Sequence, residues 1–116
     1  MMQTIPGLDC AKGLANVAGM AELYEEVLAA FVSDVEEKAD GLRILAASKD
    51  FDGFRTLAHA FKSAARSIGA DEIGEQAYRL EIAGRDADVA AIEGEVASFV
   101  ENLVALKDGI RDALKA

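Results

Sequence analysis

His59 is the only histidine in this chain of 116 residues, and Lys62 follows it three positions later. Histidine titrates near neutral pH, so a large share of its imidazole is neutral and nucleophilic in a cell. In a helix, a spacing of three places the lysine ammonium one turn away on the same side. These residue types suit the transfer of a phosphoryl group, because the imidazole can accept the group and the ammonium can neutralise part of its charge.

The segment around His59 has the pattern of an amphipathic helix. Its apolar residues recur at spacings of three and four, and they are Phe54, Leu57, Ala58, Phe61, Ala65 and Ile68. A second stripe, formed by Arg55, His59, Lys62 and Arg66, lies roughly 120° around the helix from the first. We therefore expect His59 and Lys62 on a solvated basic face, where loss of the Lys62 charge barely changes the melting temperature.

Small side chains flank His59 on the other side of the same helix. Together with one arginine they form the predicted docking surface for a partner protein, which consists of Ala60, Ser63, Ala64, Arg66 and Ser67. We interpret the two serines as spacers rather than nucleophiles. The low volume of these side chains would allow the active site of another protein to close over the imidazole.

The formal net charge is −9, from 21 acidic and 12 basic residues. A chain this acidic is a poor partner for nucleic acid, whose phosphates need a basic field, and for an anionic membrane surface. The charge is uneven, however, since no acidic residue occurs between Gly53 and Ala70, where three basic residues cluster around His59. Such a strip favours a phosphoryl group or an acidic site on a partner.

A single domain over residues 1–116 is expected from the length and from a hydrophobic content of 52%. Cys10 is the only cysteine, so neither an intramolecular disulfide nor a Cys-rich metal site is expected, and no cofactor is predicted. The chain has no apolar run of about 18 residues and no signal-peptide pattern, which favours the cytoplasm. Met1 and the compact length favour a free-standing protein.

The first part of the chain is expected to form an extended lead-in over residues 1–8, a short helix and a long helix. Asp9 is expected to cap the short helix, which should end near Gly19. The long helix is predicted over residues 20–48. Its inward stripe consists of Leu23, Tyr24, Val27, Leu28, Phe31, Val35, Leu42 and Leu45.

Three more helices are expected in the rest of the chain. The helix that carries His59 begins at a cap, Asp50 or Asp52, and stops at Gly69, which suits the left-handed position past a helix end. Asp71 is expected to cap the next helix, and the last helix runs to the end of the chain. Short connections and one apolar stripe per helix predict an all-α fold, an antiparallel up-down four-helix bundle with a short N-terminal capping helix.

The stretch around His59 resembles the histidine-containing phosphotransfer (HPt) domains. These domains carry a His, an apolar residue, Lys, then Gly or Ser and further small residues, ending in a hydrophobic residue and Gly. Here residues 58–70 read AHAFKSAARSIGA. The opening IPGLD at residues 5–9, the later pair GL at 13–14 and the pair LY at 23–24 are also similar to members of this family. The resemblance therefore covers nearly the whole chain.

The resemblance implies a bundle whose exposed His59 carries phosphoryl groups between receiver-domain aspartates in two-component signalling. It implies His59 as the phosphoacceptor, Lys62 as the residue that stabilises the phosphoryl group, and Ser63 at a small position where many members have Gly. The implied partners are receiver domains of response regulators and of hybrid histidine kinases. We expect a monomer.

Two other classes of protein stay open at this point. A helical adaptor that docks partners without phosphotransfer is one, and the intact His59 and Lys62 count against it. The dimerising region of a sensor kinase is the other, but there an acidic residue and then a proline follow the histidine, whereas Ala60 follows His59 and the only proline is Pro6. The chain also lacks an ATP-binding glycine motif, so we expect a phosphocarrier and not an enzyme.

Overall fold

A computed structural model describes residues 4–115, which form five α-helices and no strand. The helices are α1 (Cys10–Ala15), α2 (Ala21–Ser48), α3 (Phe51–Ile68), α4 (Asp71–Arg85) and α5 (Val89–Lys115). None of the helices within residues 4–115 has the length and apolar character that crossing a bilayer requires.

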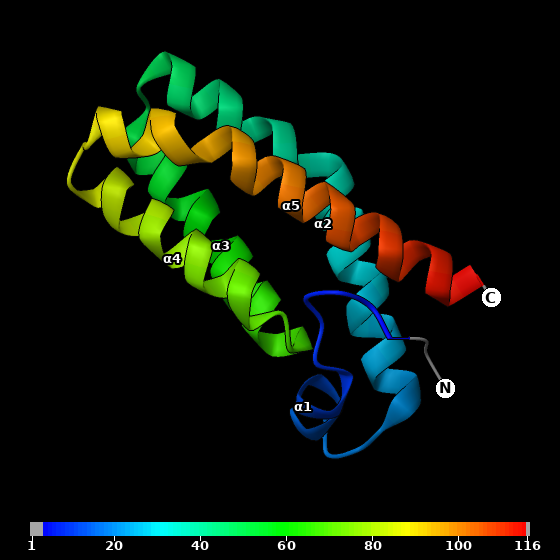
Figure 1. Ribbon diagram of the computed structural model, residues 1–116. Helices are drawn as coiled ribbons and strands as arrows, with labels where there is room; N and C mark the ends of the chain where they lie inside the picture. The colour runs from blue at the N-terminus through cyan, green and yellow to red at the C-terminus, as the bar shows by residue number, and fades with distance from the viewer. Residues whose placement is uncertain (1–3, 116) are drawn as a thin grey trace.

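Helices α2 to α5 run up and down beside one another, and α1 packs across one end of the bundle (Figure 1). Each helix of the bundle contacts its neighbour in the chain, and α5 closes the ring against α2. Figure 1 shows α1 beside the turn that joins α3 to α4, at the end opposite to the connection between α4 and α5. The predicted all-α four-helix bundle with a short N-terminal capping helix is confirmed.

The apolar stripes of all four bundle helices meet in one core. Its fully buried large side chains include Leu28, Leu42, Phe54, Ile68, Leu80, Phe99, Leu103 and Ile110. The rings of Phe61 and Phe99 meet edge to face across the bundle, with their centroids 6.4 Å apart. The predicted inward position of Leu23 is wrong, since Leu23 is 38% exposed and the inner face of α2 begins at Tyr24.

Two of the predicted helix caps are confirmed and one is wrong. The carboxylates of Asp9 and Asp50 accept hydrogen bonds from backbone N–H groups in the first turns of α1 and α3, at 3.1 and 3.0 Å. Helix α4 instead begins after Ala70, which makes no side-chain capping bond. Asp71 is the first residue of α4, and its carboxylate pairs with the ammonium of Lys12 on α1 rather than with the end of its own helix.

The first helix is shorter than predicted. It ends at Ala15, and the chain turns over residues 16–19 before α2 begins. Ala18 and Gly19 both have positive φ, at 56° and 76°. A right-handed helix cannot continue through two left-handed residues, so α1 cannot extend to Gly19.

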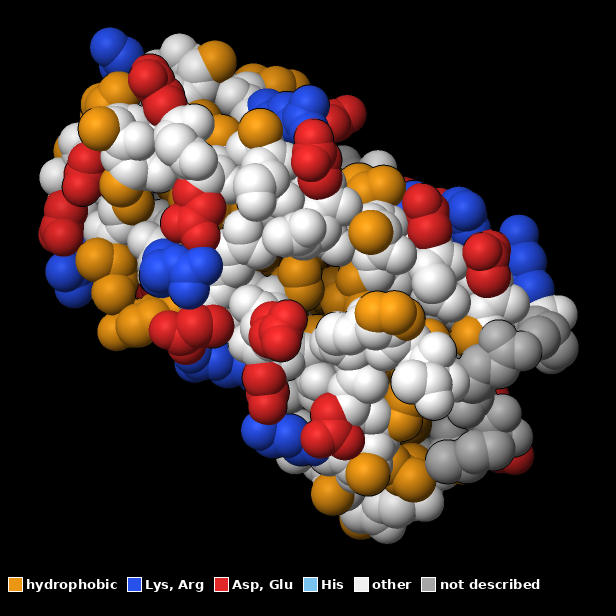
Figure 2. Space-filling model, in the orientation of Figure 1, with side chains coloured by type: hydrophobic (Ala, Val, Ile, Leu, Met, Phe, Trp, Pro, Cys, Tyr) orange, Lys and Arg blue, Asp and Glu red, His pale blue; other side chains and the backbone are white. Residues whose placement is uncertain are grey.

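Residues 4–8 form neither helix nor strand and turn at Pro6 and Gly7, while residues 1–3 of the predicted lead-in lie outside the described part of the chain. A hollow of about 670 Å³ lies between the lead-in, α4 and α5. Figure 2 shows acidic and basic side chains interspersed over this face, with hydrophobic side chains visible in the hollow. Ile5 of the lead-in is buried and forms part of its lining.

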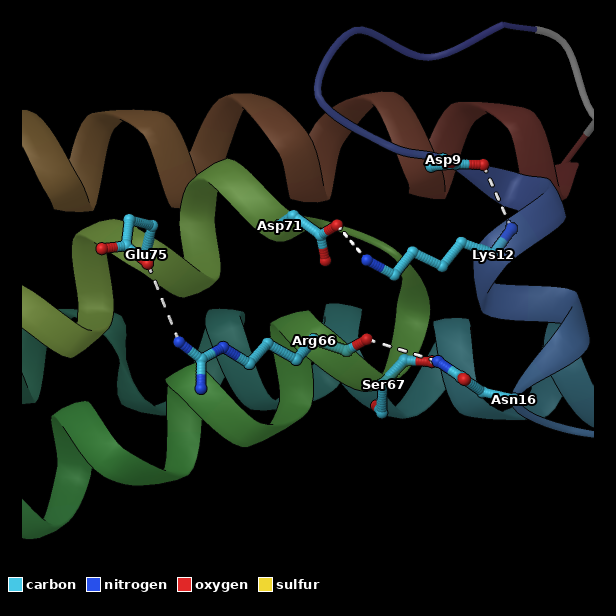
Figure 3. Close-up of polar contacts among 7 residues, drawn as sticks. All are labelled: Asp9, Lys12, Asn16, Arg66, Ser67, Asp71 and Glu75. Carbon is cyan, nitrogen blue, oxygen red and sulfur yellow. Dashed lines mark hydrogen bonds and ion pairs between the residues drawn. The ribbon is translucent and has the colours of Figure 1, made fainter.

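Polar groups of the N-terminal segment attach it to the end of α3 (Figure 3). The side-chain amide of Asn16 donates to the carbonyl oxygens of Arg66 and Ser67, at 3.4 and 3.1 Å. The backbone N–H of Asp9 donates to the carbonyl oxygen of Gly69 at 2.9 Å. These bonds satisfy carbonyl groups that the end of a helix leaves unpaired, and they hold the turn between α3 and α4 in place.

Gly69 makes this attachment possible, and its replacement is the first testable change. Its φ is +91°, the left-handed conformation that the sequence predicts, and a Cβ at this position would overlap the backbone carbonyl oxygen of Asp9. Gly69→Ala should therefore destabilise the protein by more than the roughly 1–2 kcal/mol that a left-handed conformation alone costs a residue with a Cβ. Urea unfolding followed by circular dichroism measures this loss.

Gly19→Ala is the matched control. Gly19 also has positive φ, at +76°, but a Cβ there would meet nothing within 4 Å. Gly19→Ala should therefore lower the free energy of unfolding only by the cost of the left-handed conformation itself. Equal losses of unfolding free energy in the two variants would show that the contact with Asp9 is unimportant.

Candidate functional site

His59 lies in the third turn of α3, and its side chain is 56% exposed. Its neighbours Ala58 and Phe61 are buried, at 0% and 2% exposure. The core therefore anchors one face of α3, and the rigid helix presents the imidazole on the other. This is the outward placement that the helical pattern predicts.

A carboxylate from another helix lies against the imidazole. The Oε2 atom of Glu81, on α4, is 3.0 Å from Nδ1 of His59. The Oε1 atom of the same side chain is 2.7 Å from Nζ of Lys62, in an ion pair that lacks the alignment of a hydrogen bond. Glu81 thus bridges the two α3 residues on which the sequence places the chemistry.

The predicted exposure of Lys62 is wrong. Its side chain is 14% exposed, and that of its partner Glu81 is 20% exposed. The helical wheel describes α3 alone, and it does not show that α4 covers this side of the stripe. Loss of Lys62 would remove one of the two partners of a sheltered carboxylate, and leaving such a buried oxygen unpaired typically costs about 1–3 kcal/mol. The expectation of an unchanged melting temperature therefore no longer holds.

The surroundings of Glu81 determine which nitrogen of His59 is available. Partial burial alone would raise the pKa of Glu81, but the contacts and charges of Lys62 and His59 outweigh this effect and hold the pKa below its ordinary value. The ionised carboxylate only accepts hydrogen bonds, so Nδ1 of His59 carries the proton and donates it. In the neutral ring, Nε2 then has the free lone pair, and no hydrogen bond within residues 4–115 engages it.

Acidic residues of α4 neutralise most of the basic stripe of α3. Besides the contacts of Glu81, the guanidinium of Arg66 lies 3.8 Å from the carboxylate of Glu75 (Figure 3). The stripe is thus basic in sequence but largely paired in space, which corrects the expected solvated basic face. The charge around His59 is therefore close to balanced rather than broadly positive.

The predicted docking surface separates into two parts. Ala60, Ser63 and Ser67 are exposed on the side of α3 away from α4, with Ala64 half-buried among them. The hydroxyl of Ser67 donates to the carbonyl oxygen of Ala64 at 2.8 Å, which fits a spacer. Arg66 lies apart from this small-residue strip, over α4. The strip is defined below as Ala60, Ser63, Ala64 and Ser67.

Close packing of α3 on α4 brings Glu81 to its partners. At Gly84, a Cβ would lie 3.1 Å from the ring of Phe54, so a larger residue would push the two helices apart. The sequence contains a further signal, because His59 and Glu81 lie almost equally far along the chain from the turn at Gly69. An antiparallel helical hairpin brings such residues together, but helical periodicity within one segment does not reveal the pairing.

Comparisons with known proteins agree with this architecture. The family model for the Hpt domain matches residues 26–116. The fold is also similar to the crystal structure of the HPT domain from an Hpt sensor hybrid histidine kinase of Shewanella, with a TM-score of 0.85, 15% sequence identity and 94% of each chain covered. No curated protein matches the chain in sequence.

The matched residues include His59, Lys62 and Glu81, and they make up most of the chain. The chain belongs to the Hpt domain family. This membership supports a general role in histidine phosphotransfer within phosphorelays, in contact with receiver domains and histidine kinases.

The lowered pKa of Glu81 makes its contribution to stability dependent on pH. A carboxylate whose pKa is lower in the folded state stabilises the fold above its ordinary pKa of 4.5, and this contribution is lost as the pH falls through the folded-state value. Glu81→Gln should therefore lower the melting temperature near neutral pH, and its difference from the wild type should shrink and vanish in acid. Thermal unfolding across this pH range measures the difference.

Glu75→Gln serves as the control for this experiment. The Glu75 side chain is 60% exposed, and its partner Arg66 is 3.8 Å away. Such exposed pairs contribute about 0–1 kcal/mol, so this variant should follow the wild type at every pH. A deficit in Glu81→Gln that stays constant into acid would contradict the ionised state of Glu81.

Proposed function

We propose that this protein is a phosphorelay intermediate in two-component signalling. His59 accepts a phosphoryl group from the aspartyl phosphate of a receiver domain and passes it to another receiver-domain aspartate. The observation that carries this proposal is the exposed imidazole of His59, whose Nδ1 is engaged by Glu81 so that Nε2 is left to attack phosphorus.

The accepting step forms one bond and breaks one. The lone pair of Nε2 attacks phosphorus, the N–P bond forms, and the P–O bond to the donor aspartate breaks with its electron pair left on the departing carboxylate. Nδ1 keeps its proton, so the phosphorylated ring of His59 carries a positive charge beside the carboxylate of Glu81. This carboxylate stabilises the charged ring.

The donating step reverses these changes. An acceptor carboxylate attacks phosphorus, and the electron pair of the N–P bond returns to Nε2. Because Glu81 keeps the proton on Nδ1, the ring of His59 leaves as neutral imidazole, which is a better leaving group than an imidazolate anion. The same hydrogen bond therefore supports transfer in both directions.

Lys62 supplies positive charge next to the transferred group. Its ammonium lies one helical turn from His59 and carries three N–H donors, and the ion pair with Glu81 uses none of them in an aligned hydrogen bond. Donors that are already in place stabilise charge as it develops in the transition state. In this proposal, the ammonium is shared between Glu81 and the phosphoryl group while His59 is phosphorylated.

The small-residue strip is the proposed path for the partner. Transfer requires the phosphorus to come within bonding distance of Nε2 and in line with the breaking bond. On the α4 side of His59, Glu81 and Lys62 occupy the space. A receiver domain therefore approaches over the exposed residues Ala60, Ser63 and Ser67.

An adaptor that docks partners without phosphotransfer is the alternative function. The contacts of His59 and Lys62 with a single carboxylate favour the carrier, since docking alone would not require them. The proposed chemistry takes the phosphoryl group from a partner, so the protein is a phosphocarrier without ATP-dependent kinase activity of its own. We further expect it to act as a monomer in the cytoplasm.

Incubation with a radiolabelled phospho-receiver domain tests His59 directly. The wild type should take up a label that is lost in acid and stable in alkali, as expected of a phosphoramidate. His59→Gln should fold normally, because the replaced side chain is 56% exposed, and should take up no label. Full labelling of His59→Gln would overturn the proposed function.

Bulk on the small-residue strip tests the direction of approach. Ser63→Trp should keep the helical circular dichroism, since Ser63 is exposed. It should slow transfer from the receiver at least about tenfold, because small misplacements of reacting atoms cost rate steeply. Labelling by the small donor phosphoramidate should stay near the wild-type rate.

Ala97→Trp provides the matched control for Ser63→Trp. Ala97 is exposed on α5, which packs beside α2 and α4 and meets α3 through core side chains. A tryptophan there should leave both reactions unchanged. Transfer from the receiver at the wild-type rate in Ser63→Trp would show that the partner approaches from another side.

A further inference from the structure

Tyr78 is an exposed aromatic residue beside the histidine site that the proposed chemistry has not used. Its exposure is 40%, and it lies on α4 between Glu75 and Glu81, three residues from each. These three residues form one stripe of α4, because a spacing of three keeps side chains on the same side of a helix. The stripe faces the basic stripe of α3 through the two acidic contacts described above.

Two cations of α3 lie over the Tyr78 ring. The Nζ atom of Lys62 is 5.3 Å from the ring centroid, and the Cζ atom of Arg66 is 5.7 Å from it. Both distances fall within the limit of about 6 Å for attraction between a cation and the face of an aromatic ring. One ring therefore restrains the residue next to His59 and a second cation one turn further along.

The ring and a carboxylate together determine where the Lys62 ammonium lies. Glu81 holds it at 2.7 Å, Tyr78 lies 5.3 Å away, and the side chain is only 14% exposed. A free lysine side chain has many rotamers, and ordering them costs free energy. The contacts with Glu81 and Tyr78, both on α4, offset this cost before any phosphoryl group reaches His59.

Arg66 is also held along the α3–α4 seam. A Cβ at Gly74 would lie 2.9 Å from Cγ of Arg66, so the absence of a side chain at Gly74 gives the arginine stem room to cross α4. The ion pair of Arg66 with Glu75 is long, at 3.8 Å. The contact with Tyr78 therefore contributes substantially to the position of the Arg66 guanidinium.

We propose that Tyr78 is a positioning residue for phosphoryl transfer at His59, which acts by holding the Lys62 ammonium over its ring. The proposal rests on the proposed function and adds a residue to it. Contact with an aromatic face restrains a cation without using its N–H donors, unlike a second carboxylate. The donors of Lys62 that Glu81 leaves free thus stay available to phosphoryl oxygens.

Two variants separate the effect of the ring face from that of the hydroxyl and of apolar volume. Tyr78→Phe keeps the aromatic face, whereas Tyr78→Leu keeps apolar bulk without it. With phosphoramidate as donor, labelling of His59 should be about threefold to tenfold slower in Tyr78→Leu, the range expected for loss of one cation–aromatic contact. Tyr78→Phe should restore the wild-type rate, and equal slowing in both variants would overturn the proposal.

A double-mutant cycle tests whether Tyr78 acts through Lys62. In a Lys62→Met background, Tyr78→Leu should cause almost no further slowing, because the restrained charge is already absent. The same slowing in both backgrounds would overturn the proposal, since Tyr78 would then act by another route. The melting temperature of each variant shows whether it is folded under the conditions in which its rate is measured.

An NMR measurement reads the contact without any phosphorylation. The ring current of Tyr78 should shift the ε-methylene protons of Lys62, and this shift should persist in Tyr78→Phe and disappear in Tyr78→Leu. Unshifted protons in the wild type would overturn the proposal. Labelling of His59→Gln would instead refute the proposed function, and the NMR result would still report on the contact between Tyr78 and Lys62.

Discussion

The carboxylate of Glu81 lies between an imidazole and an ammonium of another helix, and this three-way contact depends on the register of α4 against α3. The register is set at one end by the turn at Gly69, which the N-terminal segment holds by hydrogen bonds. Further along it is maintained by close packing at Gly84. A slip of α4 by one residue would rotate its side chains by roughly 100° and remove the carboxylate from His59. The lead-in and α1 therefore support the site although they lie at the end of the bundle.

Charge in this protein is distributed more evenly in space than along the chain. The formal charge is −9, yet the acid-free segment around His59 meets acidic side chains of α4 at Lys62 and Arg66. A paired site is easier to cover than an isolated charge, because an unpaired charge loses its hydration without compensation. In the proposed transfer, the ammonium of Lys62 that faces Glu81 would already lie next to the negative charge of the phosphoryl group.

Most of the architecture could be predicted from the sequence, because each bundle helix carries its own periodic apolar stripe and some helix ends have a local signal. The outward direction of His59 followed from that periodicity, and the caps at Asp9 and Asp50 followed from local chemistry. Contacts between helices could not be predicted in the same way. The burial of Lys62 and the placement of Glu81 depend on which residues of two helices meet, and a wheel drawn for one helix carries no such information.

The difference between the two flanks of His59 limits which partners can bind at the same time. One flank is occupied by the contacts with Glu81 of α4, and the exposed small-residue strip lies on the other. Two proteins cannot occupy a single opening at once, so for a carrier of the proposed kind the donor and the acceptor are mutually exclusive. In each round of transfer, the first partner must then dissociate before the second can bind. The overall rate of transfer therefore depends on the dissociation rate of the first partner as well as on the chemical step. An abundant partner that binds without exchanging phosphate would act as a competitor for the whole relay.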